Sequence, residues 1–182
     1  MGFSFPWKSI WGVKATKRVS FFFSFFFSWE ATWGKILTCD NLMRRGFLMA
    51  GWCFMCRCSG ESVDLLLLHC VVARAVWDFV FYSFGVTWVL PGRVKELMFG
   101  WRNWFGKSSP KFWNLVPLCL MWTLWWECNL HTFEDKENPT DKIIEVFMGS
   151  IFDWSRVQGS NSSPSLGAFL DSLDLSHAVQ SL

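Results

Sequence analysis

The sequence lacks the residue patterns on which the common classes of enzyme depend. It has no two adjacent aspartates and no aromatic-x-Asp-Asp word, so it does not supply the paired carboxylates that hold two metal ions in a polymerase. It also contains no glycine-rich phosphate loop, no GxSxG and no HExxH. Its three histidines, His69, His131 and His177, show no base–nucleophile spacing. We therefore expect no catalytic activity and no small-molecule substrate.

Charged residues are few, but no uncharged run reaches the length of a membrane span. The uncharged segment Phe112–Trp126 is shorter than the roughly 20 apolar residues that a span needs. The segment Val19–Trp29 follows several basic residues and resembles the apolar part of a signal peptide. However, Glu30 directly follows the segment, and the stretch has no small-residue cleavage site. We expect an intracellular protein, nuclear or cytoplasmic, and a membrane-associated hydrophobic protein is the less favoured alternative.

Aromatic residues are abundant, and the charge is unevenly distributed. The 182 residues suffice for one domain, and they include 14 Trp and 20 Phe but a single Tyr. An interior of this size does not hold so many rings, so some aromatic surface is expected to meet a partner. Residues 1–58 carry a balance of +6 and residues 59–182 a balance of −4, within a net charge of +2. A basic front half is compatible with RNA, DNA or an acidic partner.

Apolar residues at spacings of three and four predict a mainly α-helical fold. One such stripe begins at Leu66, includes Cys70 and continues to Phe84. The segment from residue 159 to 182 is rich in serine and weakly patterned, so it is expected to be a disordered tail. Helices are expected over residues 18–32, 38–46, 64–84, 94–105, 112–126 and 140–159.

The cysteines indicate a metal-binding turn between helices. Seven is an odd number, and the chain is too long for a secreted miniprotein, so a full disulfide framework is not expected. Cys53 and Cys56 form a CxxC pair on a turn-rich stretch that continues to Ser59, and Cys70 follows within an apolar run. Two thiolates at this spacing can bind one zinc ion with bonds of about 2.3 Å. Ordinary buried thiols are the alternative interpretation.

Five sequence stretches occur in an order typical of one family. They are FPWKSIWGVKATKRV, WGKILTCDNLMRRG, GWCFMC, GESVDLLLLHCVVARAVW and WTLWWECNLHTFED, at residues 5–19, 33–46, 51–56, 60–77 and 122–135. In this combination the chain resembles the zinc-binding domain that follows the reverse transcriptase in plant non-LTR retrotransposon polyproteins. The resemblance implies a domain over residues 5–158 with a zinc knuckle over residues 53–70. It also implies a non-catalytic accessory role, with RNA, DNA or a reverse transcriptase domain as partner.

The chain departs from the family pattern at two informative positions. Relatives usually carry a histidine ligand where Leu65 stands, so zinc held by the three cysteines would lack its fourth ligand unless His69 or Cys58 supplies it. Relatives usually carry arginine in the later tryptophan motif where Cys128 stands. These losses indicate a degenerate, isolated copy with weakened zinc binding. A metal-free helical interaction remnant is therefore the main alternative function.

Overall fold

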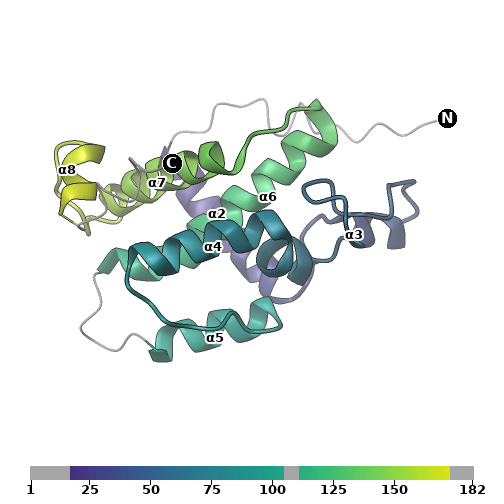
Figure 1. Ribbon diagram of the computed structural model, residues 1–182, viewed down its shortest axis with the longest axis horizontal. Helices are drawn as coiled ribbons and strands as arrows, with labels where there is room; N and C mark the ends of the chain where they lie inside the picture. Colours follow the sequence, from purple (N-terminus) through teal and green to yellow (C-terminus); the bar gives the residue numbers. More distant parts are fainter. Residues whose placement is uncertain (1–16, 105–110, 173–182) are drawn as a thin grey trace.

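The computed structural model describes residues 17–104 and 111–172, and side-chain positions over 23–101 and 112–172. These ranges form helices joined by turns and loops, and they contain no strand (Figure 1), which confirms the mainly α-helical prediction. In chain order the elements are α2 (Lys17–Thr32), α3 (Cys39–Arg44), the π-helix η1 (Leu65–His69), α4 (Val71–Ser83), α5 (Val94–Trp104), the 3₁₀ helix η2 (Lys111–Leu115), α6 (Val116–Glu134), α7 (Thr140–Val157) and α8 (Leu166–Asp171).

Helix α6 lies at the centre of the molecule because it is apolar around most of its circumference. Leu120, Met121 and Leu124 are fully buried, and α2 and α7 both pack against the helix. Pro117 lies in the first turn of α6, where its missing N–H needs no partner. The helix expected over residues 112–126 is thus divided into η2 and α6, and α6 continues to Glu134. Among the described helices, none combines the length and the apolar character needed to cross a membrane.

The helix expected over residues 64–84 is interrupted at Cys70. The five residues of η1 adopt π-helical geometry, and Cys70 (φ −54°, ψ 140°) leaves the helix before α4 begins at Val71. The Ser62 hydroxyl accepts a hydrogen bond from the Leu65 N–H at 3.2 Å, whereas Asp64 Oδ1 accepts one from the Val94 N–H at 2.8 Å. Ser62 thus caps η1, and Asp64 joins it to the start of α5.

Part of the segment expected to be disordered is folded. The Ser165 hydroxyl accepts a hydrogen bond from the Ala168 N–H at 3.2 Å and starts α8. The Phe169 ring is buried against Phe112 and Phe152, at centroid distances of 5.4 Å and 5.7 Å. The two buried apolar residues of α8, Phe169 and Leu170, suffice to dock this segment despite its serine-rich composition. The rest of the expected tail, residues 173–182, lies outside the described residues.

Candidate metal centre

Three cysteines, two from the loop after α3 and one from the residue before α4, lie close together. The Sγ atoms of Cys53, Cys56 and Cys70 all lie within 4.8 Å of one another, and Cys53 Sγ is 3.9 Å from Cys70 Sγ. Thiolates bound to tetrahedral zinc at about 2.3 Å are about 3.8 Å apart, since the edge of a tetrahedron is about 1.6 times the centre-to-corner distance. The three thiols therefore have the spacing of zinc ligands.

The loop that carries the CxxC pair is held by backbone hydrogen bonds. The Cys53 N–H donates to the Ser59 carbonyl, and the Arg57 N–H donates to the Cys53 carbonyl, both at 2.8 Å. Arg57 closes this turn in the left-handed region, at φ 54°. The N–H groups of Met55 and Cys56 face the Cys53 thiol. The stretch expected to be turn-rich is thus a sequence of turns, and it presents backbone donors to sulfur.

Cys70 stands at the N-terminus of α4, where a thiolate is stabilised. Its sulfur accepts a hydrogen bond from the Cys53 thiol and further ones from the N–H groups of Val72 and Ala73, and together these lower the pKa of Cys70 to about 6. The pKa of Cys53 is raised, because its thiol donates that hydrogen bond and is buried. Cys70 is thus the more readily deprotonated thiol of the pair, and the thiolate is the form in which sulfur binds a metal.

The two substitutes expected for a fourth ligand face away from the cluster. His69 Nε2 lies 3.1 Å from the Gly92 carbonyl, and the exposed Cys58 thiol donates to the Cys56 carbonyl at 2.9 Å. Leu65 is half-buried, and its carbonyl accepts the Cys70 N–H at 2.7 Å. Within residues 23–101 and 112–172, no further His, Cys, Asp or Glu side chain joins the three thiols. In these ranges the cluster therefore consists of three thiols.

A second cluster of polar groups, beside the knuckle, was not foreseen from the sequence. Glu61 is 4% exposed, and its carboxyl oxygens accept hydrogen bonds from the Cys39 N–H at 2.8 Å and the Cys128 thiol at 3.3 Å. Burial and the neighbouring Glu61 raise the pKa of Cys39 to about 12 and that of Cys128 well above its usual value. Both thiols stay protonated, so this cluster is structural. One feature of the sequence pointed to this cluster, namely Cys128, which stands where relatives usually carry arginine.

Glu61→Ala is expected to lower the free energy of unfolding by about 1–3 kcal/mol, because the buried Cys39 N–H loses its acceptor. Glu61→Gln keeps a carbonyl oxygen at the same place and is expected to cost less than about half as much. Urea unfolding followed by circular dichroism measures both changes. Equal losses for the two variants would show that the hydrogen bond to the start of α3 contributes nothing.

The described residues form a mainly α-helical fold that brings three thiols together at a spacing suited to a metal ion. Residues 3–77 match a family model described as zinc-binding in reverse transcriptase, and this range includes all three cysteines of the cluster. Over these residues the chain is similar to the zinc-binding domain of reverse transcriptases. No curated protein and no solved structure matches the chain.

Proposed function

We propose that the chain is a non-catalytic accessory domain, derived from a retrotransposon reverse transcriptase, that holds zinc and assists nucleic-acid binding. The observation that carries this proposal is the spacing of the Cys53, Cys56 and Cys70 thiols, which fits a zinc ion. A metal at this place would join the knuckle loop to the start of α4. With three ligands of its own, the domain would bind zinc more weakly than a complete tetrahedral site does.

All seven cysteines are free thiols, which supports an intracellular location for the protein. Reduced thiols persist in the cytosol and the nucleus, where thiolate–metal sites are also common. The nucleic acid that a retroelement domain would meet, its own RNA or the target DNA, is found in the same compartments.

The proposed contact with nucleic acid is electrostatic. The basic front half of the chain, residues 1–58, carries several exposed cations, among them Lys35, Arg45 and Arg57. Few and scattered cations of this kind bind phosphates without reading sequence. The proposal therefore implies weak binding that depends strongly on salt concentration.

Binding to a single-stranded RNA is expected to weaken about tenfold between about 50 and 200 mM salt, the loss for two to three phosphate contacts. Fluorescence anisotropy of a labelled oligonucleotide, titrated with the zinc-loaded protein, measures this slope. Tight binding that survives molar salt would contradict an electrostatic contact. No binding at low salt would remove the nucleic-acid part of the proposal and leave the zinc part standing.

A metal-free interaction remnant is the second candidate function, and the exposed face of α2 favours it. Phe23, Phe26 and Trp29 are 57%, 73% and 66% exposed, and their positions three residues apart place them along one side of the helix. Such a row is typical of a surface that meets another protein. The zinc content of the purified protein distinguishes the two candidates: near one equivalent supports the first, and none supports the second.

A further inference from the structure

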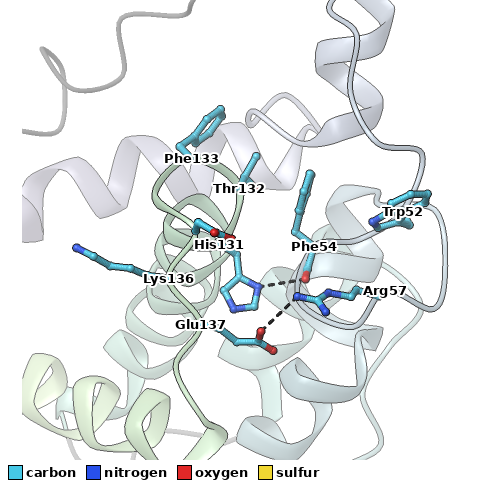
Figure 2. Close-up of a pocket in the computed structure, with 9 residues that line it drawn as sticks. Trp52, Phe54, Arg57, His131, Thr132, Phe133, Lys136 and Glu137 are labelled. Atoms are coloured by element: carbon cyan, nitrogen blue, oxygen red, sulfur yellow. Dashed lines mark hydrogen bonds and ion pairs between the residues drawn. The ribbon is translucent and has the colours of Figure 1, made fainter.

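A cavity of about 790 Å³ lies between the loop that carries the CxxC pair and the C-terminal end of α6 (Figure 2). The stretch of residues 52–57 contributes Trp52, Phe54 and Arg57 to its wall, and the end of α6 with the following loop contributes His131, Asp135 and Glu137 among others. Its volume lies in the range of about 300–1,000 Å³ that is typical of small-ligand sites. It therefore has room for one nucleotide-sized group.

The backbone on both sides of this cavity is held in an uncommon conformation. Arg57 and Asp135, at φ 54° and φ 53°, are the two non-glycine residues with positive φ in the described part of the chain, and both line the cavity. Side chains other than glycine adopt this region at a cost, and such residues gather at ligand sites. Residues next to both turns also line the cavity, among them Lys136 and Glu137.

His131 lines the cavity and carries a ring nitrogen that has no hydrogen-bond partner in the protein. Its Nδ1 lies 3.1 Å from the Phe54 carbonyl (Figure 2), and because a carbonyl only accepts, Nδ1 carries the proton. In the neutral ring Nε2 then bears a lone pair. That atom is buried and has no hydrogen-bond partner in the protein. A buried polar atom without a partner is rare and indicates a missing one, here a donor such as a base amino group or a ribose hydroxyl.

The remaining side chains favour a nucleotide as that donor. Trp52 is 53% exposed at the edge of the cavity and Phe54 lies beside it, so two aromatic rings are available for stacking. Arg57 pairs with Glu137 at 3.3 Å, but both side chains are more than 60% exposed. An ion pair so open to water is weak, so the guanidinium can turn to a phosphate.

We propose that this cavity binds one unpaired nucleotide of a single-stranded nucleic acid. The base stacks on Trp52 and Phe54, His131 Nε2 accepts a hydrogen bond from the base or the sugar, and Arg57 contacts the adjoining phosphate. The inference rests on the proposed nucleic-acid function and gives it a place on the surface. The charge of the cavity wall is nearly balanced, because Asp135 and Glu137 offset Arg57 and Lys136. A double-stranded backbone, which needs a run of cations, is therefore a poor fit.

Replacing Trp52 by alanine in the full chain tests the inference. Anisotropy titrations at low salt use labelled eight-nucleotide RNA and DNA single strands and a duplex of the same sequence. The matched control is Trp33→Ala, since Trp33 is 50% exposed but lies outside the cavity. Trp52→Ala is expected to weaken binding of one or both single strands about fivefold or more, the smallest loss for one stacked base, while Trp33→Ala changes it less than about twofold. Arg57→Gln should flatten the salt dependence by about one phosphate contact.

The possible outcomes separate this inference from the function on which it rests. If the wild-type protein binds the strands and Trp52→Ala binds equally well, the cavity inference is overturned and the proposed function stands. Equal losses for Trp52→Ala and Trp33→Ala would overturn it in the same way, and so would a preference for the duplex. If the wild-type protein binds none of the three oligonucleotides, the cavity inference falls together with the nucleic-acid part of the proposed function. Ultraviolet cross-linking of the RNA, with the cross-linked peptide identified by mass spectrometry, should mark residues 52–57 or 131–137.

Discussion

Leu65→His is expected to tighten zinc binding about tenfold or more, because it adds a fourth ligand to three that are already in place. Position 65 is where relatives in the family that the chain resembles usually carry a histidine ligand. In the structure the Leu65 carbonyl accepts a hydrogen bond from the Cys70 N–H at 2.7 Å. Zinc binding contributes on the order of 10–16 kcal/mol of free energy to the folding of small structural-zinc domains. A tenfold change in zinc affinity is a modest part of that free energy. Competition with a chromophoric chelator measures the affinity.

The matched control for this variant is Leu65→Gln, which has a polar side chain of similar size but is a poor zinc ligand. It should leave the affinity near that of the wild type. Equal zinc affinity for wild type and Leu65→His would mean that another residue already completes the shell. His69→Ala and Cys58→Ala would then identify it, although both side chains are engaged with carbonyls elsewhere in the structure.

Trp77→Ala is expected to lower the free energy of unfolding by about 3–5 kcal/mol, the usual cost of removing a large buried ring. Trp77 is fully buried and contacts Trp101 and Phe81, at centroid distances of 5.9 Å and 5.6 Å. Its indole N–H also donates to the Leu67 carbonyl at 2.9 Å. This bond ties α4 to the π-helical turn that precedes Cys70, so zinc binding should weaken together with stability.

Trp77→Phe separates the two contributions of this side chain. It retains most of the apolar contact but leaves the Leu67 carbonyl without its donor, so a loss of about 1–3 kcal/mol is expected. Chemical unfolding with tryptophan fluorescence and circular dichroism measures both variants. A loss for Trp77→Ala below about 1 kcal/mol would show that the site relaxes around the cavity and that the ring does not anchor η1.

The sequence predicted most helices and the cysteine cluster, because both depend on local spacing. The CxxC pair and the stripe around Cys70 placed the three thiols in one site. The break at Cys70 was not predictable from that stripe, since Leu66, Ala73 and Trp77 keep a buried face whether or not the helix is continuous. The break matters because it gives Cys70 the helix N-terminus that stabilises its thiolate.

Contacts between distant segments could not be read from the sequence. Glu61 and Cys128 are 67 residues apart, and Phe54 and His131 are 77 apart, so no periodicity connects them. The packing of Phe169 was missed for a different reason. A serine-rich composition predicts mobility on average, but one buried ring between Phe112 and Phe152 suffices to fix a short helix.

Cobalt(II) absorption of the intact chain is the most direct test of the claim that Cys53, Cys56 and Cys70 form one metal site. Cobalt replaces zinc in tetrahedral thiolate sites and gives charge-transfer absorption whose intensity follows the number of bound thiolates. The account predicts one equivalent of bound cobalt with the intensity of three thiolates, and a loss of about one third in Cys70→Ser. No thiolate charge-transfer band, or a band unchanged in Cys70→Ser, would contradict it.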